Sequence, residues 1–112
     1  MAVFVSNIVI EQGFDFDTTF QLEDTSTNNL LNLNSYTMDA QLRKTYSSTT
    51  SVSFASTIVT PTEGTISISL TSTQTLGLKP GRYVYDVKLI APSGQLTKAV
   101  EGAALVRAGV TR

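Results

Sequence analysis

The sequence contains no cysteine, no histidine and no tryptophan. Without cysteine the protein can form neither a disulfide bond nor a thiolate metal site, so its fold is independent of the redox compartment. Without histidine, the usual Ser-His-Asp and Cys-His mechanisms and histidine zinc sites are excluded. We therefore expect a protein that is not an enzyme and that carries no cofactor.

Charge is also sparse, since charged residues make up 15% of the chain and the formal net charge is -1. The eight Lys and Arg are scattered and do not alternate with aromatic residues, so neither nucleic acid nor a membrane surface is an expected partner. No apolar run approaches the roughly 20 residues of a membrane helix. The apolar start of the chain has no basic residues before it and is interrupted by Ser6 and Asn7, which favours a first strand over a signal peptide.

Apolar and polar residues alternate with a period of two along most of the chain, as in half-buried strands. Five segments follow this pattern closely: 14–22, 36–42, 52–58, 66–70 and 83–89. Two end segments are less regular. In 2–10 the apolar phase shifts, as at a bulge or a change of sheet, and in 95–107 small residues leave room for a neighbouring backbone. The pattern predicts one all-β domain, residues 1–112, an immunoglobulin-like β-sandwich of about seven antiparallel strands.

One short segment departs from the strand pattern. Thr71 and Gln74 have the spacing of a helix capping box, which predicts one helical turn over residues 71–78. We expect Leu76 and Leu78 to pack beneath this turn.

The stretch LKPGRYVYDVKL, residues 78–89, follows directly and joins a turn to a strand. In immunoglobulin-like sandwiches a tyrosine near the start of strand F bonds back to the upstream backbone and forms a tyrosine corner. We expect such a structural corner here, built from Leu78, Gly81, Tyr83 and Tyr85. Tyr83 takes the corner position, and Tyr85 takes the core position that a cysteine holds in antibody domains.

Carboxylates are the remaining candidates for chemistry. Asp15 and Asp17 share the solvent face of one strand, and with Glu11, Glu23 and Asp24 they could offer oxygen ligands to calcium. No motif with the spacing of a calcium loop accompanies them, and a solvated strand face that discourages edge pairing is the alternative. A glycosidase pair would need a sugar cleft with surrounding aromatics, which this composition does not favour.

Two groups of residues are candidates for docking onto other proteins. Basic residues at strand ends and turns are either ordinary exposed charge or a contact to an acidic partner: Arg43, Lys44, Lys79 and Arg82. Near the end of the chain, Val106, Val110 and Arg112 are candidates for docking onto a neighbouring subunit.

The sequence resembles a family of small tailed-phage virion proteins over nearly its whole length. The similar segments are LRK (42–44), GTISISLTSTQTLGLKPGRYVYDVKL (64–89) and the terminal EGAALVRAGVTR (101–112). The run VIEQGFDFDTTFQLEDTSTNNLLNLNSYT (9–37) is similar to the same group and, more loosely, to the N-terminal domain of phage upper baseplate proteins. The distinctive parts are the Gly-Arg-Tyr-Val-Tyr-Asp block and the final Val-Thr-Arg, which are structural motifs.

The resemblance implies a non-enzymatic structural subunit of a virion, assembled in the host cytoplasm and present in many copies. Its partners would then be other phage structural proteins, either major capsid or tail and baseplate subunits. We expect an accessory protein that decorates the capsid, because the chain is a lone small domain without a fibre or stalk. A baseplate or tail component is the first alternative. A module that binds glycans or a host protein through the loops DTSTNN (24–29) and YSSTTS (46–51) is the second.

Overall fold

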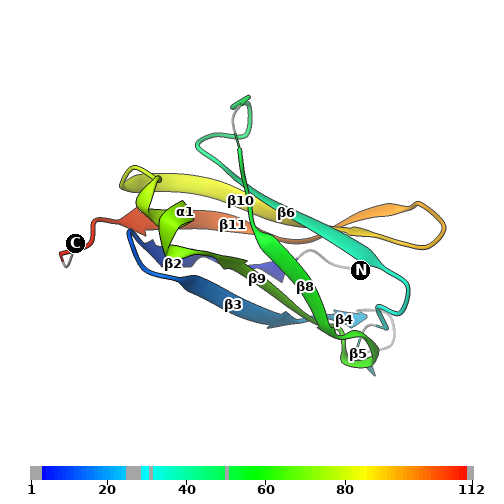
Figure 1. Ribbon diagram of the computed structural model, residues 1–112. Helices are drawn as coiled ribbons and strands as arrows, with labels where there is room; N and C mark the ends of the chain where they lie inside the picture. Colours follow the sequence, from blue (N-terminus) through cyan, green and yellow to red (C-terminus); the bar gives the residue numbers. More distant parts are fainter. Residues whose placement is uncertain (1–3, 25–28, 31, 50, 111–112) are drawn as a thin grey trace.

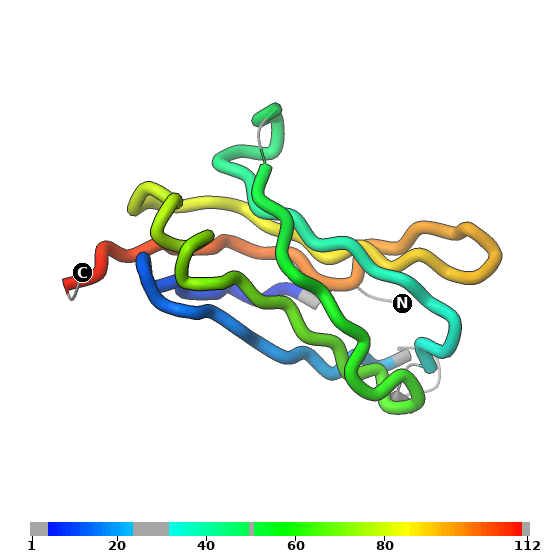
Figure 2. Tube along the Cα trace, viewed as in Figure 1, coloured from blue at the N-terminus to red at the C-terminus, as the bar shows by residue number. Residues whose placement is uncertain are grey.

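A computed structural model describes residues 4–24, 29–30, 32–49 and 51–110. The chain forms two facing β-sheets (Figures 1 and 2). The large sheet has the strand order β1-β11-β10-β6-β7, with β2 also paired to β11. Its strands are β1 (Phe4–Val5), β2 (Ile8–Glu11), β6 (Thr37–Arg43), β7 (Val52–Ser53), β10 (Gly81–Ile90) and β11 (Leu96–Arg107). The small sheet has the order β3-β9-β8, with β3 (Phe16–Gln21), β8 (Ala55–Thr60) and β9 (Thr65–Leu70).

This topology is that of an immunoglobulin-like β-sandwich, as predicted. Strands β3, β9 and β8 take the places of strands B, E and D, and β6, β10 and β11 take those of C, F and G. The predicted strand over 52–58 is divided between the sheets: β7 pairs with β6, and β8 pairs with β9. A short β4 (Glu23–Asp24) and β5 (Asn29–Leu30) pair as a ribbon that the alternation pattern did not predict.

For residues 2–10 the sequence allowed either a bulge or a strand that changes sheets. The segment does not change sheets, so the second of these alternatives is wrong. β1 and β2 both pair with β11, and they do so in parallel, with Val5 opposite Glu101 and Ile8 opposite Ala104. Figure 2 shows the blue N-terminal segment beside the orange-to-red β11. The strand is interrupted only at residues 6 and 7, and the register is the same on both sides of the interruption. Val5 is exposed because it points outward, which explains the apparent phase shift in the sequence.

The core lies between the two sheets and follows the predicted alternation. Ile66, Ile68 and Leu70 face it from the small sheet, and Val87 and Leu89 face it from the large sheet. All five side chains are at most 2% exposed. Phe14, expected in the same apolar row as Phe16, is instead 47% exposed because it precedes the start of β3.

The predicted helical turn is present as α1 (Ser72–Leu76), between β9 and β10. Its capping box is confirmed: Thr71 Oγ1 accepts from Gln74 N at 3.3 Å, and Thr71 N donates to Gln74 Oε1 at 2.9 Å. Leu78 is buried as expected, but Leu76 is 56% exposed. The residue beneath the helix is Thr75, which is fully buried. A 3-10 turn, η1 (Pro61–Glu63), joins β8 to β9.

Thr75 attaches the helix to the turn that precedes β3. Its Oγ1 donates to Phe14 O at 2.8 Å and accepts from Gly13 N at 3.0 Å. Gln12 adds a second link, because its Nε2 donates to Leu78 O at 2.9 Å. These bonds satisfy backbone groups that neither sheet can pair, and they fix the position from which β10 starts.

The small residues of β11 do admit a neighbouring backbone, and that backbone is the chain's own N-terminal segment. A Cβ added to Gly102 would lie 1.9 Å from the carbonyl oxygen of Ser6. Ser6 N donates to Glu101 O at 2.9 Å, and Asn7 Oδ1 accepts from Ala103 N at 3.0 Å. The interruption between β1 and β2 is therefore bonded to β11 at both of its residues.

We expect the substitution Gly102→Ala to lower the free energy of unfolding by about 1–3 kcal/mol, because backbone must move to admit the methyl group. Gly77→Ala is the matched control, since its Cβ would have an ordinary contact of 3.6 Å with Gln74 O and its φ is -75°. Urea unfolding of both variants checks this. Equal midpoints for the two would show that the N-terminal segment is not held against β11 as described.

Candidate interaction surface

The corner between α1 and β10 contains the bond that the tyrosine-corner hypothesis requires. The Tyr83 hydroxyl donates to the carbonyl oxygen of Lys79 at 2.8 Å. The Lys44 ammonium lies over the Tyr83 ring, 4.7 Å from its centroid. Gly81 has a φ of 148°, which disfavours any side chain there, and an added Cβ would lie 2.8 Å from Lys44 Nζ. The corner is half-buried, so water competes for its hydrogen bond.

Tyr85 is the more deeply placed of the two tyrosines, at 3% exposure in the core. Its hydroxyl donates to the carbonyl oxygen of Ser6 at 2.6 Å, which joins β10 to the N-terminal segment. The centroid of its ring lies 6.1 Å from that of Phe54, with the two rings packed edge to face. The Phe54 centroid lies in turn 6.3 Å from the ring centroid of Phe16 in the small sheet. The tyrosine at the expected cysteine position thus begins an aromatic chain that connects the two sheets.

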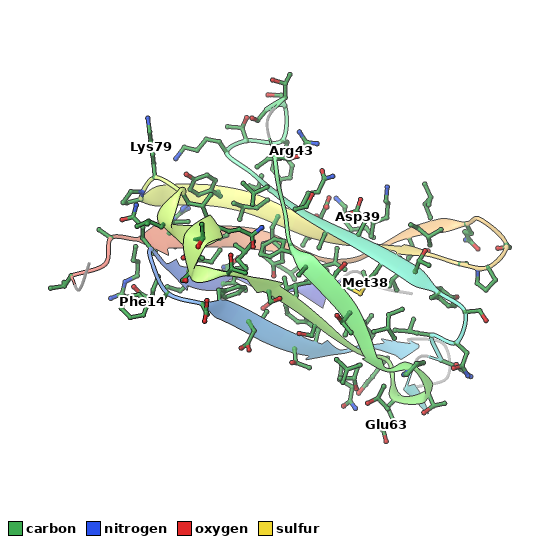
Figure 3. All side chains as sticks on the ribbon, viewed as in Figure 1. Phe14, Met38, Asp39, Arg43, Glu63 and Lys79 are labelled. Atoms are coloured by element: carbon green, nitrogen blue, oxygen red, sulfur yellow. The ribbon has the colours of Figure 1, made fainter. Side chains whose placement is uncertain are left out.

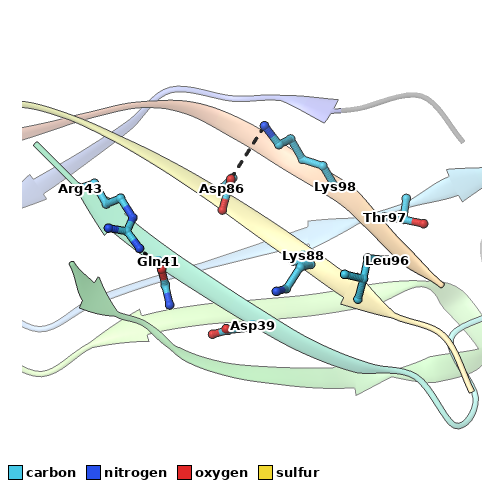
Figure 4. Close-up of a pocket in the computed structure, with 8 residues that line it drawn as sticks. All are labelled: Asp39, Gln41, Arg43, Asp86, Lys88, Leu96, Thr97 and Lys98. Carbon is cyan, nitrogen blue, oxygen red and sulfur yellow. Dashed lines mark hydrogen bonds and ion pairs between the residues drawn. The ribbon is translucent and has the colours of Figure 1, made fainter. Parts of the chain in front are cut away.

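The outer face of the large sheet contains an open hollow of about 350 Å³. Figure 4 shows its lining, which comes from three adjacent strands: Asp39, Gln41 and Arg43 of β6, Asp86 and Lys88 of β10, and Leu96, Thr97 and Lys98 of β11. The lining residues of β6 and β10 are spaced by two along each strand, and they point outward because a strand alternates its residues between the core and the solvent. The hollow is shallow and polar, which suits the side chains of a partner surface better than an enclosed small molecule.

Part of the charge on this face is paired within the sheet. Lys98 Nζ lies 3.8 Å from Asp86 Oδ2 and 3.3 Å from Glu101 Oε2. The Arg43 guanidinium donates to Ser48 O at 2.6 Å and to Gln41 Oε1 at 3.0 Å, so its direction is fixed without an acidic partner. Lys88 stands opposite both Asp39 and Lys98 in the strand ladders.

The calcium candidates are not brought together. Within the part of the chain that the structure describes, no three acidic side chains converge on a metal position. Asp15 Oδ1 instead accepts from Ser72 N at 2.7 Å, so it attaches α1 to the segment before β3. Glu11 pairs instead with Arg107, its neighbour in the β2–β11 ladder of the large sheet, at 3.4 Å. Asp17 remains on the solvent face of β3, as the alternative interpretation expected.

The candidate docking residues near the end of the chain separate into different environments. Val106 is 1% exposed, because it lies on the inner face of β11 opposite Ile10, so it belongs to the domain's own core and cannot dock. Val110 is 93% exposed and is available to a partner. Arg112 lies outside the described residues.

Sequence reasoning missed two residues that position the site: Ser6 and Thr75. Ser6 was identified only as an interruption, although its carbonyl receives the Tyr85 hydroxyl. A lone threonine in a polar helix carries no signal of burial. Gly102, by contrast, is one of the small residues of 95–107 that were predicted to leave room for a neighbouring backbone, and glycine inside a strand often marks such an approach.

No family model and no curated protein sequence matches the chain. Among solved structures, an internalin-like protein of Listeria monocytogenes aligns with 96% of this chain at 19% identity and a TM-score of 0.48. This chain spans only 28% of the length of that protein. Murine CRIg aligns over 92% of both chains at 12% identity and a TM-score of 0.44. Similarity at this level assigns neither protein's role to the present chain. No helix in the described residues is long and apolar enough to cross a membrane.

We expect Tyr85→Phe to lower the free energy of unfolding by about 1–3 kcal/mol, because the Ser6 carbonyl loses its partner in a partly buried site. Tyr83→Phe should cost about 1 kcal/mol or less, since water can reach Lys79 O. Urea unfolding of the two variants side by side measures the difference. A loss for Tyr83→Phe equal to or larger than that for Tyr85→Phe would contradict this assignment of the two tyrosines.

Burial raises the pKa of the Tyr85 phenol above its ordinary value of 10.0. The unfolded chain therefore loses this proton at a lower pH than the folded protein does. Its contribution to stability is fully present below about pH 10 and is lost as the pH rises from there through the folded-state pKa. We expect the unfolding free energy of the wild type to fall more steeply above pH 10 than that of Tyr85→Phe.

Proposed function

We propose that the protein is a non-enzymatic structural subunit of a tailed-phage virion, an accessory protein that docks on the capsid surface. The proposal rests first on the resemblance of the sequence to small virion proteins, above all in the block Gly81–Asp86. That block forms the start of β10, in the middle of the large sheet. Its inward residue Tyr85 holds the core together, and its outward residues Arg82 and Asp86 belong to the exposed face.

The location of this block is the observation that carries the proposal. The segment that resembles virion proteins builds both the scaffold of this domain and part of the surface that we propose it offers to a partner. The hollow on that surface is lined by side chains that form ion pairs and hydrogen bonds, which suits contact with another protein. Many copies on one particle would turn modest individual contacts into stable attachment.

A baseplate or tail component is the second candidate, favoured by the similarity of residues 9–37 to the N-terminal domain of upper baseplate proteins. In the structure this region supplies β3, an edge strand of the small sheet, with the solvent-facing carboxylate of Asp17. A tail protein would also use such a face for docking, so the two candidates differ in the position on the particle and in the identity of the partner.

Immunogold electron microscopy of purified phage particles, with an antibody to this protein, distinguishes the candidates. We expect gold over the heads. Gold at the tail end would replace the decoration proposal by the baseplate candidate. Gold on neither, with the protein present only in the infected-cell lysate, would overturn the virion assignment. It would favour a soluble recognition module that uses the loop around Tyr46, which is 77% exposed.

A further inference from the structure

The described basic residues all belong to one of the two sheets, whereas the acidic residues occur on both. Every Lys and Arg that the structure describes lies on a strand of the large sheet or in a turn at the end of one: Arg43, Lys44, Lys79, Arg82, Lys88, Lys98 and Arg107. The small sheet and its adjoining turns, residues 14–24 and 54–76, contain no Lys or Arg. Their acidic side chains Asp15, Asp17, Glu23 and Glu63 are exposed. In Figure 3, Arg43 and Lys79 lie on the opposite side of the sandwich from Glu63.

Pairing within the domain leaves this division in place. The ion pairs among the described residues are Lys98 with Asp86 and Glu101, and Arg107 with Glu11, all on the large sheet. No ion pair there involves Arg43, Lys44, Lys79, Arg82 or Lys88, and none involves an acidic residue of the small sheet. Glu11, Asp39, Asp86 and Glu101 also lie on strands of the large sheet, so its seven basic residues leave an excess of three positive charges. The small sheet and its adjoining turns keep an excess of negative charge.

We propose that the outer face of the large sheet in one copy of this chain binds the outer face of the small sheet in a second copy. The contact is heterologous, since different surfaces of the two copies meet. Two large-sheet faces would bring positive charge against positive charge, and two small-sheet faces would bring negative against negative. The division of charge therefore selects the unlike pairing over either symmetric one.

The shapes of the two faces permit this contact. The outer face of the small sheet is built from short side chains, with Thr19, Ser67 and Thr57 aligned across its three strands. A neighbouring surface can therefore approach it closely. The large-sheet face adds apolar area, because Val9 and Leu105 stand opposite each other in the β2–β11 ladder and are 48% and 43% exposed.

The area is also sufficient. The domain extends 45 Å along its longest axis and at least 20 Å across. A face of these dimensions offers on the order of 900 Å², against the roughly 800 Å² per partner of an interface of standard size. Because the contact depends on exposed charges, it should weaken strongly with salt. It concerns copies of this chain alone and so does not depend on the position of the protein on a virion.

Two variants test the proposal, each reversing the charge of one face. Arg82→Glu with Lys88→Glu makes the large-sheet face acidic, and Asp17→Lys with Glu23→Lys and Glu63→Lys makes the small-sheet side basic. In either variant both faces of one copy carry the same sign. Sedimentation velocity of the wild type at millimolar concentration and low salt should show association that falls at least tenfold in about 0.5 M salt. Each variant alone should remain monomeric at low salt, and an equimolar mixture should associate again.

Lys79→Glu is the control. Lys79 adds to the positive charge of the large sheet, but it lies in the turn before β10 and therefore outside the strand face that would contact the second copy. This variant should associate as the wild type does. Restored association in the mixture also shows that the variants are folded, which their melting temperatures check independently. A wild type that stays monomeric overturns the proposal and assigns the basic face to a different, acidic partner. Loss of association in only one variant overturns it in favour of a symmetric contact between like faces.

Discussion

The hydrogen bond from the Tyr85 hydroxyl to the Ser6 carbonyl is the interaction on which the rest of the sandwich depends. It places the N-terminal segment against β11, because Gly102 has no side chain between them. It fixes the Tyr85 ring against Phe54, and through Phe54 the ring connects to the small sheet. A chain without cysteine thus uses a phenol and two phenylalanines at the position where antibody domains use a disulfide bond.

Much of this fold could be predicted from local sequence, because strands that are buried on one face alternate their residues strictly. The buried rows that end in Leu70 and Leu89 are examples. The capping box of Thr71 and Gln74 was predictable for a different reason, because its hydrogen bonds join residues only three positions apart. Contacts between distant parts of the chain were harder to predict. Nothing near Ser6 shows that a hydroxyl 79 residues away will reach it, and nothing near Thr75 shows that it will hold the backbone of residues 13 and 14.

The candidate surface was predictable only in part for a related reason. Arg43, Lys44, Lys79 and Arg82 were identified as possible contacts to an acidic partner from their places at strand ends. Their membership in one sheet depends on the strand order, in which β10 separates β6 from β11. Val106 was predicted as a candidate docking residue, but it is buried in the core. A valine near the end of a chain gives no indication that its strand lies inside a sheet. Charge becomes a property of a face only after the chain has folded.

The parallel pairing of β1 and β2 with β11 has a mechanical consequence. The N-terminal strands β1 and β2 run in the same direction as the last strand, β11. The start of β1 and the end of β11 therefore lie at opposite ends of the ladder of hydrogen bonds that joins them. Tension applied between the two termini would act along this ladder and load its hydrogen bonds together, in shear. Antiparallel terminal strands would instead be peeled apart one bond at a time. The geometry therefore makes the domain stiff along the axis between its termini, and the bonds at Ser6 and Asn7 carry part of that load.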